Sequence, residues 1–207
     1  MTSVLIIGNA RHENLSKWSE LIEESDVIIA CDGALDNCLE NNLAVDIVIG
    51  DMDSVSKSAL EYTKQNSVQV IEIAEQNSND LSKAIVYAEN LQPESINIIG
   101  VDGGNSEHQL ANYLTLIETK THAKIYLDDC VVFCASSSSP VTYSIDLGTP
   151  FSVFSIGTSK TVCLAGGKWK LNGEDLEPSS QGLHNIAEEK EIRISCQTGN
   201  LLIFVAR

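Results

Sequence analysis

The hydrophobic positions in the first 127 residues follow two spacings in turn. Short continuous apolar runs are typical of strands buried on both faces, and they predict strands at 4–8, 27–31, 47–50, 68–74, 96–100 and 124–127. Between them, apolar residues recur every three or four positions and predict helices at 15–22, 56–65, 80–91 and 107–119. This alternation predicts a mostly parallel sheet with crossover helices.

The pattern changes at about residue 128, and no helical spacing follows. Short apolar runs predict strands at 131–135, 141–145, 151–156, 162–164, 192–196 and 201–205. Turn residues separate these runs, at Ser136–Pro140, Gly148-Thr149-Pro150, Asn172-Gly173 and Gly199-Asn200. The second part is therefore expected to be a small antiparallel sandwich or barrel. The fold class is α/β followed by all-β, with domains at 1–127 and 128–207.

Composition and charge exclude several classes of protein. The chain has 207 residues, of which 43% are hydrophobic, and 13 basic against 29 acidic side chains give a net charge of −16. Such hydrophobic content excludes general disorder, and the acidity argues against nucleic acid or an anionic membrane surface as a partner. No apolar run is long enough to span a membrane, and no secretory signal precedes the first strand. The six cysteines form no C-x-x-C pair, which favours reduced thiols in a cytoplasmic protein.

Carboxylates directly follow two of the predicted buried strands. Asp32 follows the run at 27–31, and Asp51 and Asp53 follow the run at 47–50. The carboxyl ends of parallel strands are where open α/β sheets bind ligands, so these acids are expected to lie near one another. Clustered carboxylates repel one another unless a cation neutralises them, and oxygen donors favour Mg²⁺, which bridges carboxylates to substrate phosphates. A magnesium ion would also supply the positive charge with which this acidic chain could bind an anionic substrate.

Two further features stand where a strand is followed by a helix. Asp80 opens a predicted helix, and Gly103-Gly104 lies in a strand-to-helix loop whose backbone N–H groups are suited to phosphate. Each motif also has a simpler interpretation. Asp80 or Asn79 is a common helix cap, Asp32 before glycine is an ordinary turn, and a lone D-x-D is weakly specific. The repetition of such residues at several strand ends favours the functional interpretation.

The motifs occur in a fixed order along nearly the whole chain. They are Cys31-Asp32-Gly33-Ala34, Gly50-Asp51-Met52-Asp53-Ser54, Asn79-Asp80-Leu81, Gly103-Gly104 through Glu107-His108-Gln109-Leu110-Ala111-Asn112, Gly167-Lys168-Trp169-Lys170-Leu171 and Ser180-Gln181-Gly182-Leu183-His184-Asn185. In this order they resemble the thiamine pyrophosphokinase family. The resemblance implies an α/β nucleotide-binding domain followed by a β-sandwich. It also implies a homodimer that transfers the pyrophosphoryl group of ATP to the hydroxyl of thiamine, giving thiamine diphosphate and AMP.

The resemblance also assigns expected roles to individual residues. Asp51, Asp53 and Asp80 are the implied magnesium ligands, and Asp32 and Glu107 are further implied catalytic acids. The implied contacts to ATP are Asp32, Ser54, Gly103, Gly104 and His108. The implied thiamine contacts are Trp169, Ser180 and Asn185. A flat aromatic ring suits a cationic thiazolium, although packing in the sandwich core is the competing explanation for Trp169. The active site is implied to lie at the dimer interface.

The chain departs from the family pattern in the glycine loop and at two other positions. Asn105 stands where the family has Arg, which removes a fixed phosphate fork, and Glu107 stands where it has Asp. Asn79 replaces a Thr and His184 replaces a Ser.

Two alternative functions remain open on sequence. Asp51 and Asp53 after an apolar strand also resemble the nucleophile motif of haloacid-dehalogenase-type phosphatases, although that motif normally follows the first strand of its domain. A non-catalytic nucleotide- or thiamine-binding module is the other alternative, which the changes at Asn105 and Glu107 favour and the retained aspartates disfavour.

Overall fold

The computed structural model describes residues 2–10, 14–103 and 105–207. The chain forms two compact units that divide between Leu127 and Asp128. None of the helices within the described residues combines the length and the apolar character that a membrane span requires.

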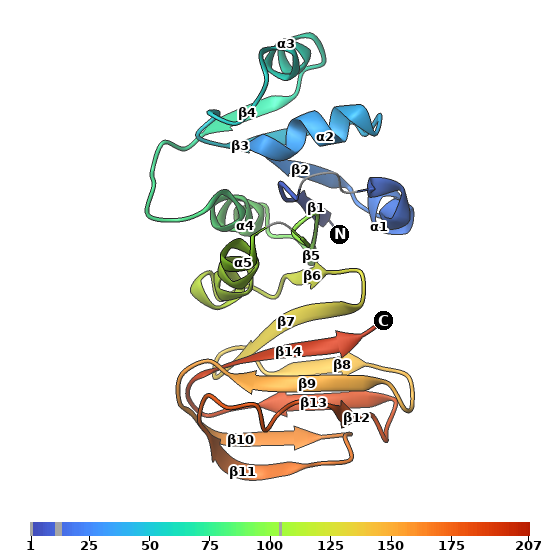
Figure 1. The fold of residues 1–207 in the computed structure, drawn as a ribbon, viewed down its shortest axis with the longest axis vertical. Coiled ribbons are helices and arrows are strands. Elements are labelled where there is room, and N and C mark those ends of the chain that lie inside the picture. The colour runs from blue at the N-terminus through green and yellow to red at the C-terminus, as the bar shows by residue number, and fades with distance from the viewer. Residues whose placement is uncertain (1, 11–13, 104) are drawn as a thin grey trace. The chain divides into compact units, whose positions relative to one another are not determined.

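The first unit is built on a six-stranded sheet, whose strands and helices alternate along the chain (Figure 1). Its strands are β1 (Ser3–Ile7), β2 (Val27–Cys31), β3 (Ile47–Gly50), β4 (Gln69–Glu72), β5 (Ser95–Ile99) and β6 (Lys124–Tyr126). They lie in the order β6-β5-β1-β2-β3-β4, and every neighbouring pair is parallel. The prediction of a mostly parallel sheet with crossover helices is confirmed, since each predicted strand is present within two residues at either end.

The helices described in this unit are η1 (Leu15–Trp18), α1 (Ser19–Glu23), η2 (Asp32–Ala34), α2 (Leu35–Glu40), α3 (Lys57–Gln65), α4 (Asp80–Asn90) and α5 (Ser106–Glu118). Three of these described helices, η1, α3 and α4, begin after a polar side chain that accepts a free backbone N–H. The Ser56 hydroxyl caps α3 by accepting the N–H of Ala59 at 3.1 Å, and the Asn79 side chain caps α4 by accepting the N–H of Ser82 at 2.8 Å. The helical spacing at 15–22 corresponds to a 3₁₀ turn followed by a short α-helix. Sequence analysis gave no bounds for α2.

The core of the first unit lies under α4, which contacts β1, β2 and β3. Leu81, Ala84, Ile85 and Ala88 are buried on one face of α4, at the spacing expected of an amphipathic helix. The central strands are buried along almost their whole length, whereas β4 at the end of the order is mostly exposed. The sheet is therefore most tightly held around β1, β2 and β3.

Within the described residues, the strands of the second unit form two antiparallel groups of four (Figure 1). One has the order β12-β9-β14-β7, and the other has the order β11-β10-β13-β8. The strands are β7 (Cys130–Ser136), β8 (Val141–Ser144), β9 (Pro150–Ser155), β10 (Ser159–Ala165), β11 (Leu171–Leu176), β12 (Asn185–Ile186), β13 (Glu191–Ser195) and β14 (Asn200–Ala206). Phe133 of one sheet stacks on Tyr143 of the other, with ring centroids 4.7 Å apart. The predicted C-terminal antiparallel sandwich is confirmed.

One turn predicted in this unit is wrong. Asn172-Gly173 lies inside β11, which sequence analysis did not identify as a strand. The pairing of β10 with β11 shifts register. Gly173 has φ 108°, a backbone conformation that residues with a side chain rarely adopt. A glycine that usually signals a turn here marks an irregularity within a strand.

Candidate active site

The carboxyl ends of β2 and β3 bring three aspartates together. Asp32 begins η2 directly after β2, while Asp51 and Asp53 follow β3, and the two strands are parallel neighbours. Position 50 decides how closely these ends approach. A methyl group on Gly50 would lie 2.6 Å from both Cβ and Cγ of Asp32, well inside van der Waals contact. The absence of a side chain on Gly50 therefore allows the Asp32 carboxylate to lie against β3.

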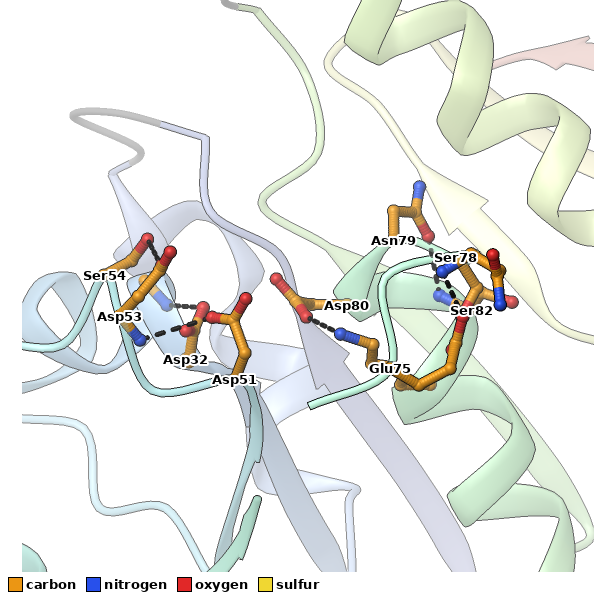
Figure 2. Close-up of polar contacts among 12 residues, drawn as sticks. Asp32, Asp51, Asp53, Ser54, Glu75, Ser78, Asn79, Asp80 and Ser82 are labelled. Atoms are coloured by element: carbon orange, nitrogen blue, oxygen red, sulfur yellow. Dashed lines mark hydrogen bonds and ion pairs between the residues drawn. The ribbon is translucent and has the colours of Figure 1, made fainter. Parts of the chain in front are cut away.

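Carboxylate oxygens of Asp32, Asp51 and Asp53 all lie within 4.8 Å of one another. Figure 2 shows the three side chains converging from two separate segments of the chain. Asp32 is only 2% exposed, Asp51 is half-buried and Asp53 is exposed. This cluster, called the aspartate cluster below, is thus open to solvent on the side of Asp53.

The backbone between Asp51 and Asp53 is shaped to hold both side chains. Met52 has φ 65°, the left-handed conformation that non-glycine residues seldom adopt. The N–H of Asp53 turns back to donate to Asp51 Oδ1 at 3.2 Å, and the Ser54 hydroxyl donates to Asp53 Oδ1 at 2.8 Å. The same conformation occurs at helix ends and turns elsewhere in the chain, such as Asn42, so here it shapes the segment and does not by itself mark a functional site.

The two oxygens of Asp32 have different surroundings. Oδ1 accepts the N–H of Gly33 at 2.5 Å. Oδ2 is buried and has no hydrogen-bond partner among the residues that the structure describes. A buried carboxylate oxygen without a donor is costly and calls for a partner such as a cation. The aspartate cluster therefore fits a hard divalent metal ion: it offers three carboxylates within a short distance, one of which lacks a donor of its own.

The pKa values of Asp32 and Asp51 shift in opposite directions. Burial raises the pKa of Asp32, and the nearby negative charge of Asp80 raises it further. The pKa of Asp51 is lowered, chiefly by the hydrogen bond from the N–H of Asp53 and also by the positive charge of Lys83. Of these two carboxylates, Asp32 is consequently the one whose negative charge the protein stabilises less well.

Asp80 lies beside the aspartate cluster, in the first turn of α4 (Figure 2). It is not one of the three residues whose carboxylate oxygens lie within 4.8 Å of one another. Its Oδ1 instead accepts from the ammonium of Lys83 at 2.9 Å, and its side chain is 34% exposed. The structure thus places Asp80 near the cluster with one oxygen already engaged.

Lys83 is a residue that sequence analysis missed. It lies one turn after Asp80 on α4, and its side chain is only 5% exposed. Its spacing of three residues from Asp80, on the helix that follows the acidic motif, is a signal from which the pair could have been found.

The glycine loop and the start of α5 are separate from the aspartate cluster among the described contacts. Gly103 is exposed with φ 82°, and Gly104 lies outside the described residues. Glu107 and His108 are exposed in the first turn of α5. Among the residues that the structure describes, no side-chain hydrogen bond or ion pair joins Glu107 or His108 to the three aspartates. Their implied roles stay predictions.

The sandwich contains a cavity of about 360 Å³ that is lined by two of the three residues assigned to thiamine. Trp169 and Asn185 are in its wall, whereas Ser180 is not, although both of its sequence neighbours are. Trp169 is 56% exposed, so core packing does not explain it. The remaining lining is mostly apolar, and Glu177 adds a carboxylate. This mixture suits a flat, partly cationic molecule.

Asn185 holds the backbone of Trp169 in place. Its Oδ1 accepts the N–H of Trp169 at 3.1 Å, and its Nδ2 donates to the Trp169 carbonyl at 2.8 Å. Asn185 itself is buried in β12, which pairs with β9. The amide therefore fixes the position from which the exposed indole extends.

Comparisons with known proteins identify the family of the chain. The family model "Thiamin pyrophosphokinase, catalytic domain" matches residues 18–127, which is more than half of the chain. No curated protein sequence matches at a significant level.

Similar solved structures cover the whole chain. A Bacillus subtilis structure titled thiamine pyrophosphokinase has 20% identity and a TM-score of 0.79, covering 100% of this chain and 99% of its own. One from Geobacillus thermodenitrificans has 18% identity and a TM-score of 0.80, with 100% and 98% covered. Yeast thiamin pyrophosphokinase has 15% identity and a TM-score of 0.76, with 100% and 86% covered. The chain therefore belongs to the thiamin pyrophosphokinase family, a family of kinase-type transferases.

Proposed function

We propose that this protein transfers the pyrophosphoryl group of ATP to the hydroxyl of thiamine in a magnesium-dependent reaction, giving thiamine diphosphate and AMP. The α/β unit, residues 1–127, binds the nucleotide and magnesium and carries the catalytic acids. The sandwich, residues 128–207, binds thiamine. The family membership supports the reaction, and the aspartate cluster and the sandwich cavity support this division of labour.

The observation that carries the metal proposal is the buried, unpartnered Oδ2 of Asp32 beside two more carboxylates. Asp51, Asp53 and Asp80 would hold Mg²⁺, as the family pattern implies, with Asp32 beside them in the same site; Asp80 lies close enough to Asp32 to raise its pKa. Mg²⁺ bound there would neutralise phosphate charge and stabilise the charge that develops at the β-phosphorus. In a chain with a net charge of −16, a metal is the simplest source of positive charge for ATP.

The order of the strands in the sheet indicates where the nucleotide would bind. The strand order reverses between β1 and β5, and ligands of open α/β sheets bind outside the carboxyl ends of strands at such a point. The loop after β5 contains Gly103 and leads into α5. We assign phosphate binding to Gly103 and Gly104, and further ATP contacts to Ser54 and His108, as the family pattern implies.

In the chemical step the thiamine hydroxyl oxygen attacks the β-phosphorus, and the bond from that phosphorus to the bridging oxygen of AMP breaks. The hydroxyl proton passes to a carboxylate of the protein. Asp32 and Glu107 are the two candidates. The position of Asp32 inside the aspartate cluster favours it over Glu107, which is exposed at the start of α5.

The sandwich residues serve thiamine. The exposed indole of Trp169 offers a face to the cationic thiazolium, and Asn185 keeps that indole in position. Ser180 lies between two residues of the cavity wall and is assigned here only by the family pattern.

We further propose a homodimer, with each active site shared between the acids of one chain and the sandwich of its partner. The sandwich exposes several large apolar side chains that an interface would cover: Leu147, Trp169, Leu183 and Ile186. A cytoplasmic location is supported by the cysteines. All six lie in the described residues, and none forms a disulfide.

The test is to incubate the purified protein with ATP, MgCl₂ and thiamine, and to measure AMP and thiamine diphosphate by chromatography. Equal amounts of the two products are expected, and neither should form without thiamine or with EDTA. Asp53→Asn should remain folded yet lose at least about 100-fold in turnover, because a metal ligand is lost. A binding module would form no AMP. A phosphatase of the haloacid-dehalogenase type would hydrolyse an added phosphate monoester without ATP or thiamine, through an aspartyl-phosphate that can be trapped.

A further inference from the structure

Lys83 is buried where a lysine is ordinarily costly. Its neighbours along α4 (Leu81, Ala84 and Ile85) form the apolar face that packs on the sheet, and its own side chain is 5% exposed. An ammonium removed from water requires compensating charge or hydrogen bonds. Asp80, three residues earlier on the same helix, provides both at a distance of 2.9 Å.

The charges around Lys83 are those of the candidate site. Asp80, Asp51 and Glu75 all stabilise its positive charge, which outweighs the effect of burial and raises its pKa. Glu75 lies in the segment that leads to α4, and Asp51 belongs to the aspartate cluster (Figure 2). Lys83 therefore acts as a positive charge held beside these acids by its ion pair with Asp80.

We propose that Lys83 is a positioning residue for the metal site: its ammonium fixes the Asp80 carboxylate and supplies the positive charge that keeps the acids close together before magnesium binds. The inference rests on the proposed magnesium site. It goes further because it assigns a role to a residue that neither the sequence motifs nor the family resemblance singled out.

Two physical effects follow from this arrangement. Asp80 is one-third exposed, and the ion pair restricts its side chain to one orientation, in which Oδ1 is occupied by the lysine and Oδ2 is not. Lys83 also offsets the mutual repulsion of Asp80 and Asp51, because its positive charge acts on both carboxylates. Without the lysine, a metal ion would have to provide this neutralisation alone.

The experiment compares thermal unfolding of Lys83→Met, Lys83→Arg and the wild type. Each is measured in EDTA with NaCl, and in MgCl₂ at the same ionic strength, without substrates. Lys64→Met is the matched control, because it removes the same charge from an exposed position in the last turn of α3. The readout is the rise in Tm that Mg²⁺ produces in each variant.

Lys83→Met is expected to lower Tm in EDTA by roughly 5–10 °C, because the partly buried carboxylate of Asp80 loses the positive charge that compensates it. The rise in Tm with Mg²⁺ should be larger than in the wild type, because the metal replaces the missing positive charge. Lys83→Arg should retain most of the stability and show a rise close to that of the wild type. Lys64→Met should change neither quantity. An equal rise with Mg²⁺ in Lys83→Met and the wild type would show that the lysine only packs, and it would overturn the proposal.

A double-mutant cycle in EDTA keeps the inference testable if Lys83→Met is too unstable to study alone. Adding Asp80→Asn should recover part of the lost stability, because the uncompensated carboxylate is removed. Additive losses from the two substitutions would reject the inference. Failure of the proposed metal site gives a different result: the wild type itself would gain no stability with Mg²⁺, whereas the cycle in EDTA would still show the coupling.

Discussion

Adding a single methyl group at position 50 should disable the site while leaving every carboxylate in the chain. In Gly50→Ala the new Cβ would stand 2.6 Å from Cβ and Cγ of Asp32. Ordinary carbon–carbon contact is about 3.5 Å, so the Asp32 side chain or the end of β3 must move by roughly 1 Å. Gly50 does not have a positive φ, so alanine brings no backbone strain of its own.

The size of the effect follows from that displacement. A shift of about 1 Å in a catalytic group costs on the order of 100-fold in rate, and overpacking of a buried site costs about 1–3 kcal/mol of stability. We therefore expect kcat/KM to fall at least about 30-fold, while Tm falls by roughly 2–10 °C. Formation of AMP is measured at 25 °C, where the variant is folded, together with the Mg²⁺ concentration that gives half-maximal rate, which should rise.

Gly148→Ala is the control for this experiment. Position 148 lies in a turn of the sandwich with open space around a new Cβ, so only the cost of its left-handed backbone is expected. Its kcat/KM should remain within a few-fold of the wild type. If Gly50→Ala has the activity and Mg²⁺ requirement of Gly148→Ala, the close approach of Asp32 to β3 does not matter for the reaction.

Three further predictions concern the acids, the indole and the assembly. Asp32→Asn should raise Tm at pH 7 in EDTA, because the raised pKa of Asp32 means that its ionised form costs stability above that pKa. This gain in Tm should shrink as the pH falls through the raised pKa toward the ordinary aspartate value of about 4. Asn185→Ala should raise the KM for thiamine about 10-fold with little change in the KM for ATP, because Trp169 loses both backbone hydrogen bonds. Mixing Asp53→Asn chains with Trp169→Ala chains, each inactive alone, should restore activity after subunit exchange, because one site of each mixed dimer combines two intact parts.

Each of these has a result that would contradict it. A gain from Asp32→Asn that is unchanged between pH 4 and pH 7 would mean that the charge of Asp32 is not responsible. An equal rise in both KM values for Asn185→Ala would indicate general loosening of the sandwich. A monomeric mass in solution, or no recovery of activity despite proven exchange, would exclude a shared site.

The parallel sheet was predictable because its strands are buried on both faces. Such strands appear as uninterrupted Val and Ile runs, as at β2 and β3, whose bounds the sequence predicts to the residue. The amphipathic spacing of α4 predicted its buried face, whereas Leu110 and Leu114, which carry the spacing of α5, are exposed. Edge strands give a weaker signal, and β4 is accordingly shorter than its apolar run.

The sequence could not predict β11, β12 or the bounds of α2. β11 has the sequence LNGEDL, in which polar residues and an Asn-Gly pair outweigh the apolar positions, and its place is determined by pairing with β10. β12 is two residues long and exists only through β9. α2 follows a 3₁₀ turn, so its short apolar spacing gives no separate helix signal. These elements depend on tertiary contacts rather than on local pattern.

In the candidate site, too, some contacts were predictable from the sequence and others depend on tertiary packing. The proximity of Asp32, Asp51 and Asp53 followed from the rule that parallel strands end at one edge, and the structure brings these three together. The pairing of Asp80 with Lys83 depends on the depth at which α4 packs, which periodicity does not reveal. The assignment of Glu107 rested on a position in the family pattern and stays a prediction.

The exposed strand β4 bears on how the protein behaves at high concentration. It is the last strand in the order of its sheet, and it pairs on one side, with β3, among the described strands. Open strand edges invite edge-to-edge addition of another chain, which leads to aggregation. β4 is only four residues long and ends in Glu72, in a strongly negative chain, so an approaching copy would gain few hydrogen bonds and meet a like charge. The short length of β4 and the charge at its end thus protect the sheet from growing beyond its own chain.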